Sequence, residues 1–303
     1  MWKKIIFVAL ATLSMCSINA QTVKTYSDRY DKLVSLFGPA GVGIETVLND
    51  WEKLDSADVK LIKARYSYYL TKGRKTQVVR NSNPKYLGLK PLLSLKDSLN
   101  QEVYYFEEPV YDEENLMYAL KALDRGIKYY PENLDFRFGR TALLLDYEKE
   151  SPDMVLQDLL AIVDYNEQNS YDWVMEGIDN PDKEFVNEAL QEYCYKFYSI
   201  GSSSSLEAFK TLSEMVLKYE PKNPVFLGNL GSYYQHAGNI KKALKYYKKV
   251  LKIDESNYAV IRNTVAIAIS MKDKKLQKQV LPLLAKYGNE QDKIMAEGRL
   301  SLL

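Results

Sequence analysis

The chain has 303 residues, of which 46% are hydrophobic and 27% charged, as in a soluble globular protein with a sizeable core. Glycine (14) and proline (10) are too scarce for a collagen-like or disordered chain. The 41 basic and 40 acidic residues leave a net charge of +1, so we expect no nucleic-acid partner. One histidine and two cysteines leave little material for histidine-dependent catalysis or a multi-histidine metal site, and we expect a protein that is not an enzyme and holds no metal or cofactor.

Residues 1–20 have the layout of a secretory signal peptide. Lys3 and Lys4 precede an apolar run over residues 5–13, and the segment ends on the small residue Ala20. The apolar run is shorter than the roughly 20 residues that cross a bilayer. We therefore expect cleavage after Ala20 and an exported protein, periplasmic or secreted, with no transmembrane segment.

A lipid anchor is the alternative to simple export. Leu13-Ser14-Met15-Cys16 resembles the attachment sequence of bacterial lipoproteins, but Met15 stands where glycine, alanine or serine is expected. Export without a lipid at Cys16 is therefore the preferred interpretation. The mature chain then holds one cysteine, Cys194, in an aromatic stretch that predicts a buried, unreactive thiol.

The remainder of the chain has the apolar periodicity of helices on both sides of one break. A polar loop over residues 167–182 carries Trp173, and Ser202 to Ser205 reads as a short turn. The expected helices cover residues 26–37, 43–54, 58–72, 113–130, 134–148, 152–166, 183–200, 206–219, 224–236, 240–253, 257–271, 274–287 and 290–301.

The break, over about residues 74–112, has strand-like composition. Residues 92–96 and 103–106 are rich in β-formers, and turn-forming residues lie between them at 97–101. We expect a β-hairpin inserted between helical repeats. Insertions in repeat proteins map to loops, so the hairpin either binds a ligand or covers apolar surface.

The clearest repeat lies near the C-terminus. Residues 216–223 recur at an offset of 34 as residues 250–257. Leu227, Leu230, Gly231 and Tyr234 are spaced i, i+3, i+4, i+7 and so share one helix face. Gly231 gives room for a second helix, whose Ala243 and Tyr247 fill the space. All of these residues are predicted to face other helices.

This pattern resembles the tetratricopeptide (TPR) repeat over residues 224–257. Leu227, Tyr247 and Glu255 replace the tryptophan, phenylalanine and proline of the TPR pattern. Two degenerate copies precede it: Ala119-x-x-x-Leu123 before Pro131, and a segment from Trp51 to Gly73 with Tyr66 in the Gly231 position.

Motifs that would carry chemistry are incomplete. The glycine-rich segment 38–43 is followed by Ile44 and Glu45, without the lysine of a phosphate-binding loop, so we read it as an interhelical loop. His236 ends a predicted helix, where a histidine interacts well with the helix dipole. The many tyrosine pairs predict one packed and one available ring per pair.

Residues 128–139 together with the repeat are similar to exported TPR proteins of Bacteroidetes. The resemblance implies an all-α, TPR-like helical-hairpin solenoid, here as one domain over residues 21–303. It implies a protein-interaction scaffold that binds a protein or peptide of the cell envelope. The alternative is a peptide- or glycan-binding envelope component that uses the inserted hairpin and the Trp173 loop.

In similar solenoids the first helix of each pair lines the concave surface. These helices carry small and polar side chains on the face opposite the packed stripe. Such side chains can form hydrogen bonds with the backbone of a bound peptide. The predicted partner-binding residues are Asn229, Ser232, Gln235, Arg262 and Asn263.

Overall fold

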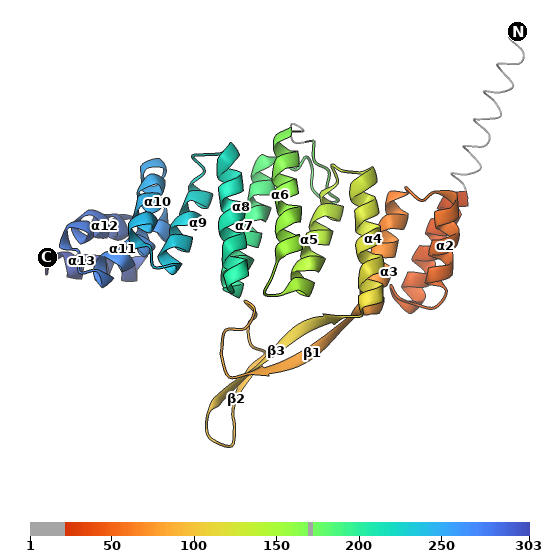
Figure 1. Cartoon of the computed structure of the whole chain (residues 1–303), viewed down its shortest axis with the longest axis horizontal. Helices are drawn as coiled ribbons and strands as arrows, with labels where there is room; N and C mark the ends of the chain where they lie inside the picture. The colour runs from red at the N-terminus through yellow and green to blue at the C-terminus, as the bar shows by residue number, and fades with distance from the viewer. Residues whose placement is uncertain (1–21, 169–171) are drawn as a thin grey trace, which may run out of the picture. The chain divides into compact units, whose positions relative to one another are not determined.

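The computed structural model describes residues 22–168 and 172–303. The predicted signal peptide and Cys16 lie outside these residues. The chain divides into two compact units, one of residues 1–147 with 172–181 and the other of residues 148–171 with 182–303. Both are mainly helical (Figure 1), and each is described below by itself. The predicted fold class, an all-α TPR-like solenoid with a small β insert, is confirmed.

The first unit holds helices on both sides of the predicted break. Their bounds agree with the sequence-based ranges to within a few residues, because polar capping residues mark the starts. Asp58 accepts backbone hydrogen bonds from Lys60 and Leu61, and Asp112 accepts one from Asn115. The helices are 22–37, α2 (Ile44–Leu54), α3 (Val59–Gly73), α4 (Glu113–Tyr129) and α5 (Leu134–Glu148).

The insertion is a three-stranded antiparallel sheet in the order β1-β3-β2, one strand larger than the predicted hairpin. Strands β2 (Leu93–Lys96) and β3 (Glu102–Tyr111) form that hairpin, and the Asp97 side chain closes its turn. Strand β1 (Arg74–Asn81) pairs with the other edge of β3. It was missed because its side chains are largely polar and exposed, which gives no two-residue apolar alternation.

The sheet replaces the turn of one helical hairpin, rather than lying between repeats as predicted. Helices α3 and α4 pack against each other, and the insertion leaves from the end of one and returns to the start of the other (Figure 1). Its two ends meet where the Asp112 amide donates to the Gly73 carbonyl at 2.9 Å. The degenerate copy around Ala119 is therefore α4, and the part of the other copy that holds Tyr66 is α3, so the two belong to one hairpin.

The second unit is a succession of helices. Side chains of Asp182, Ser202, Asn223 and Asn239 accept hydrogen bonds from the first turn of the following helix. Ser202 starts α8 earlier than predicted, so the expected turn there is wrong. The helices are α6 (Asp153–Gln168), α7 (Lys183–Ile200), α8 (Ser203–Tyr219), α9 (Pro224–His236), α10 (Ile240–Ile253), α11 (Tyr258–Ser270), α12 (Lys274–Tyr287) and α13 (Glu290–Leu300).

The 34-residue repeat extends one copy beyond its clearest sequence match. Gly238 has φ 73° in the turn between α9 and α10, and Lys272, 34 residues on, has φ 55° between α11 and α12. Both turns carry the same three backbone hydrogen bonds, one of which is Asn239 N to Tyr234 O at 2.8 Å in the first turn and Asp273 N to Ala268 O at 3.0 Å in the second. This six-to-one bond is typical of a helix that ends in a left-handed residue.

The core of the clearest repeat is built as predicted. Leu227, Leu230, Gly231, Ala243 and Tyr247 are buried, and Tyr234 is half-buried. A Cβ at Gly231 would overlap the ring of Tyr247, so the missing side chain lets this ring lie against the α9 backbone. Tyr246 instead stacks on Tyr234, with ring centroids 5.6 Å apart.

Burial also confirms the prediction for Cys194 and corrects that for Trp173. Cys194 is fully buried, and burial raises the pKa of its thiol to about 12. Trp173 is 4% exposed and lies over the Arg137 guanidinium at 5.5 Å, because the neighbouring Val174 forms a β-bridge to Asn133. Its indole therefore offers no exposed ring for a glycan.

Candidate functional site

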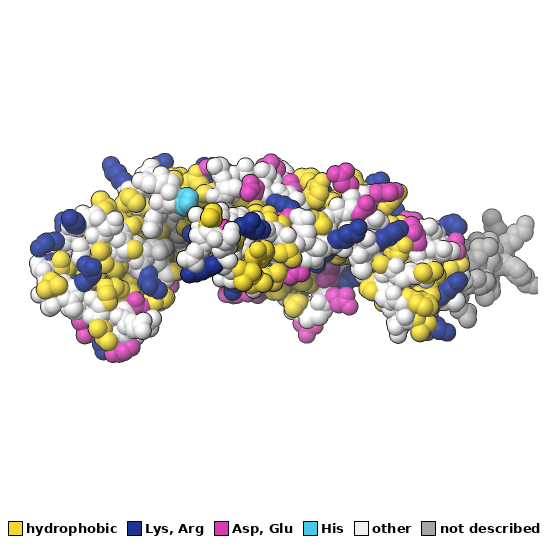
Figure 2. Space-filling view, turned by 90° about the horizontal axis from the view of Figure 1, so that it is seen from below, with side chains coloured by type: hydrophobic (Ala, Val, Ile, Leu, Met, Phe, Trp, Pro, Cys, Tyr) yellow, Lys and Arg dark blue, Asp and Glu magenta, His cyan; other side chains and the backbone are white. Residues whose placement is uncertain are grey.

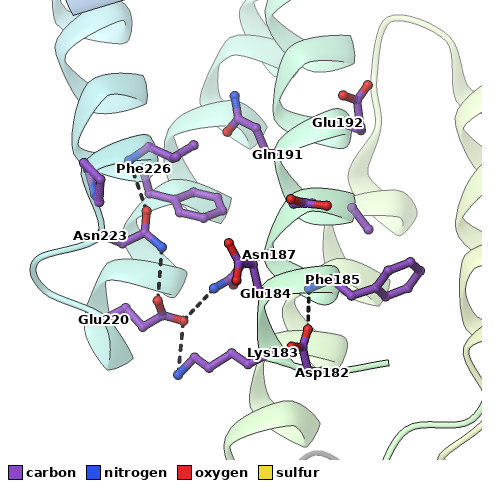
Figure 3. A pocket seen from close by; sticks show the side chains of 14 residues that line it. Asp182, Lys183, Glu184, Phe185, Asn187, Gln191, Glu192, Glu220, Asn223 and Phe226 are labelled. Carbon is purple, nitrogen blue, oxygen red and sulfur yellow. Dashed lines mark hydrogen bonds and ion pairs between the residues drawn. The ribbon is translucent and has the colours of Figure 1, made fainter. Parts of the chain in front are cut away.

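The second unit contains a groove of about 1010 Å³ between α7 and α9. Both are the first helices of their pairs, α7 with α8 and α9 with α10. Apolar side chains from both helices line it, namely Phe185, Ala189, Val225 and Phe226. In Figure 3 the Phe226 ring points from α9 towards α7. The volume of the groove lies at the upper end of the range found for ligand-binding sites.

One row of side chains on α7 holds the two sides of the groove together. Lys183, Asn187 and Gln191 are spaced four apart and so lie on one helix face. Glu220, at the end of α8, accepts from Lys183 at 3.1 Å and from Asn187 at 2.9 Å (Figure 3). Burial alone would raise the pKa of the Glu220 carboxyl. The hydrogen bonds from these donors outweigh this effect, so the pKa is lowered.

Asn223 joins this network from the start of α9. Its side-chain amide donates to Glu220 at 3.0 Å, while its oxygen accepts from the Val225 amide at 3.1 Å (Figure 3). The helix cap therefore also fixes one wall of the groove.

A second row on α7 is acidic. Glu184, Glu188 and Glu192 are exposed, line the groove and repeat every four residues. Within residues 22–168 and 172–303, none of the three has a cation within 4 Å. The cations on the same helix are engaged elsewhere: Lys183 pairs with Glu167 and Glu220, and Lys196 lies over Tyr193.

Five residues were predicted to bind a partner. Asn229 was expected at the surface, but the structure places it in the interior. It is 8% exposed, and its side chain donates to Gln191 at 2.7 Å. Gln191 lines the groove and Asn229 does not, so Asn229 holds the position of a lining side chain through this hydrogen bond. This contact joins helices 38 residues apart in sequence, which no local pattern indicates.

Three of the remaining predicted residues, Ser232, Gln235 and Asn263, lie within hydrogen-bonding distance of the Tyr247 hydroxyl. The Tyr247 hydroxyl donates to Gln235 at 2.8 Å, accepts from Asn263 at 3.2 Å and lies 3.3 Å from the Ser232 hydroxyl. All three are half-buried. They satisfy the polar end of a ring whose body lies in the core.

Arg262 is the predicted site residue that stays at the surface. Its side chain is 60% exposed, lies over the Tyr258 ring and is 3.9 Å from Asp292. Arg262 is therefore accessible to a partner, although it does not line the groove between α7 and α9.

A second hollow, in the first unit, differs in its charges. It measures about 850 Å³ and is lined by residues of α3, by residues 130–135 and by residues 174–176. Its lysines are paired: Lys60 lies 2.6 Å from Asp31, and Lys63 lies 2.7 Å from both Asp135 and Glu176. Among the described residues, the carboxylates of the acidic row in the α7–α9 groove form no comparable ion pairs.

The histidine singled out in the sequence lies at a helix end, as predicted. His236 is exposed at the end of α9, with its ring 6.1 Å from that of Tyr198. Figure 2 shows this one histidine on a face where acidic and basic side chains are interspersed. In the described part of the chain, no group of three or more histidine, cysteine or acidic residues could hold a metal ion.

The comparison with protein families matches residues 224–257 to the tetratricopeptide repeat. The match has the same bounds as the repeat read from the sequence, and it covers α9 and α10. No match to the chain is found among curated proteins. Among the helices of residues 22–168 and 172–303, none is both long and apolar enough to cross a membrane. TPR repeats are typically non-enzymatic scaffolds that bind other proteins.

Proposed function

We propose that the chain is an exported protein-interaction scaffold that binds a segment of a cell-envelope protein in the groove between α7 and α9. The observation that carries this proposal is the groove itself, formed by the first helices of two successive pairs. One of its walls is α9, the first helix of the matched TPR repeat, and the walls are fixed by Glu220 and Asn229. A fixed groove binds a peptide without first having to order its own walls.

Site-specific photocrosslinking in cells tests the groove. A photoreactive residue at Val225, which is 42% exposed and lines the groove, should capture one discrete partner. The matched control is the same residue at Ile294, which is 64% exposed on α13. Ala189→Trp fills the groove and should abolish the Val225 adduct. Equal adducts at both positions, or an adduct that survives Ala189→Trp, would contradict the proposal.

Export is the second element of the proposal and rests on the layout of residues 1–20. Intact-mass analysis of the native protein should give a mature chain that begins at Gln21. A diacylated Cys16 as the N-terminus would instead place the protein on a membrane surface. A chain that retains residue 1 would contradict export.

One observation supports a role for the insertion as an alternative binding surface. Val78, Leu93 and Leu95 project on the same face of the sheet according to its register, and their exposures are 62%, 47% and 55%. Because the insertion ends meet at Gly73 and Asp112, residues 75–110 can be replaced by a short glycine-rich turn. Loss of partner capture with helical content retained would favour the insertion over the groove.

A further inference from the structure

We propose that the groove between α7 and α9 recognises an extended peptide segment in which lysine or arginine alternates with apolar residues. This inference rests on the proposed function and names the chemistry of the partner. The groove combines an apolar floor, from Phe185, Ala189 and Val225, with the acidic row of Glu184, Glu188 and Glu192.

Within the acidic row, Glu184 lies in the first turn of α7, where a carboxylate stabilises the start of the helix, whereas Glu188 and Glu192 lie beyond that turn. The neighbouring row of Lys183, Asn187 and Gln191 makes the contacts to α8 and α9. Glu184, Glu188 and Glu192 make no ion pair within residues 22–168 and 172–303. Carboxylates four residues apart on a helix repel each other and destabilise it, so charge from a partner would relieve a repulsion that the fold leaves in place.

The spacing of the carboxylates fits an extended chain. Residues four apart on a helix are separated by about 6 Å along its axis. In an extended peptide, side chains on the same side recur every two residues, or about 6.6 Å. A peptide that runs along α7 therefore places every second side chain opposite one carboxylate, where lysine or arginine forms charge-assisted hydrogen bonds.

The side chains between these cations project to the opposite side of the peptide, away from α7 and towards the α9 side of the groove, where Val225 lies, while Phe185 and Ala189 lie beside the peptide backbone. Phe185 and Ala189 lie next to the acidic row on α7, and Val225 comes from the start of α9. Apolar side chains of the peptide remove this surface from water. The groove therefore selects both the charge of its ligand and its alternation.

The test uses fluorescence anisotropy with three short labelled peptides and the folded protein. The first alternates lysine with valine, the second has the same composition in two blocks, and the third alternates glutamate with valine. We expect the alternating lysine peptide to bind at least about tenfold more tightly than the other two. Its affinity should fall steeply with salt, since exposed charges are screened within about 10 Å at 0.1 M ionic strength.

The decisive variant is Glu184→Gln with Glu188→Gln and Glu192→Gln, which keeps side-chain shape and removes three charges. It should weaken binding of the alternating lysine peptide at least about tenfold and change the melting temperature little, since the repulsion that it removes offsets the lost interaction of Glu184 with the N-terminus of α7. The matched control removes three exposed charges outside the groove, Glu214→Gln with Glu290→Gln and Glu297→Gln. It should bind within about twofold of the unmodified protein.

The outcomes separate this inference from the proposed function. Equal binding by the two triple variants, or equal binding of the alternating and block peptides, would overturn the inference. If the Val225 photocrosslink to the native partner survives the groove triple variant, the groove still binds a protein but does not select its charge. If Ala189→Trp leaves both the adduct and the lysine peptide unaffected, the groove is not the binding site.

Discussion

The ring of Tyr247 occupies the space that a side chain on Gly231 would fill. The small residue on α9 and the large one on α10 are complementary, and together they set how closely the two helices pack. In the next copy, 34 residues on, the corresponding residues are Val265 and Leu281, both buried. The same space is thus divided between two side chains of intermediate size.

Gly231→Leu should overpack the α9–α10 pair and lower the free energy of unfolding by roughly 1–3 kcal/mol. The double variant Gly231→Val with Tyr247→Leu copies the pair found at Val265 and Leu281, and should recover most of this loss relative to Gly231→Val alone. Urea unfolding followed by circular dichroism measures both effects. If the two substitutions are simply additive, the Tyr247 ring is not what Gly231 accommodates.

Lys272→Gly should stabilise the protein by about 0.5–1 kcal/mol. Lys272 has φ 55°, a left-handed conformation that strains a residue with a Cβ, and glycine relieves this strain at a smaller cost in unfolded-chain entropy. The equivalent residue Gly238 gives the matched control, since Gly238→Lys should destabilise by a comparable amount. A loss of stability in Lys272→Gly would show that the lysine side chain contributes more than its backbone strain costs.

Tyr247→Phe should destabilise the protein by about 1 kcal/mol or more, because Ser232, Gln235 and Asn263 lose their common hydrogen-bond partner. Arg262→Ala should leave stability within about 0.5 kcal/mol, since this side chain is exposed. Thermal melts of both variants, compared with partner capture, distinguish structural from binding roles. Unchanged stability with impaired capture in Tyr247→Phe would assign the three polar residues to a binding surface.

Cys194 should be inert in the native state. Its pKa is raised from 9.0 to about 12 by burial, so the native thiol stays protonated while the unfolded chain loses the proton near pH 9. The stability that this thiol contributes is present below pH 9 and is lost as the pH rises towards 12. The advantage of the unmodified protein over Cys194→Ala in urea unfolding should therefore shrink from pH 8 to pH 10.

Thiol labelling gives an independent measurement. A disulfide reagent at pH 8 should react with Cys194 slowly in buffer and rapidly in urea. Equal rates would mean that the thiol is reached without unfolding, contrary to its burial.

Local signals were sufficient for the helices. Residues such as Asp58, Asn223 and Asn239 cap helices through bonds to amides only two or three positions away, so their effect is visible in the sequence. The glycine and tyrosine of the clearest repeat could likewise be assigned to a packed interface, because helical spacing determines which residues share a face.

The candidate site depended on contacts that sequence spacing does not contain. Asn229 was expected at the surface, yet it meets Gln191 on a helix 38 residues earlier. Trp173 was expected on a polar loop, yet a β-bridge from Val174 to Asn133 draws it into the core. The acidic row on α7 became a candidate binding feature only in the folded unit, where Glu184, Glu188 and Glu192 line an apolar groove and are exposed.

Periodicity, capping and turn formation act over a few residues, so the helical-hairpin class, the repeat at 224–257 and the residue range of the insertion could be predicted from the sequence. Which polar side chains pair with one another, and which stay exposed, depended on the packing of the helices. The physical reason is that pairing requires donors and acceptors to approach within about 3 Å, and only the packing of helices distant in sequence brings Glu220 to Asn187 and leaves Glu188 exposed.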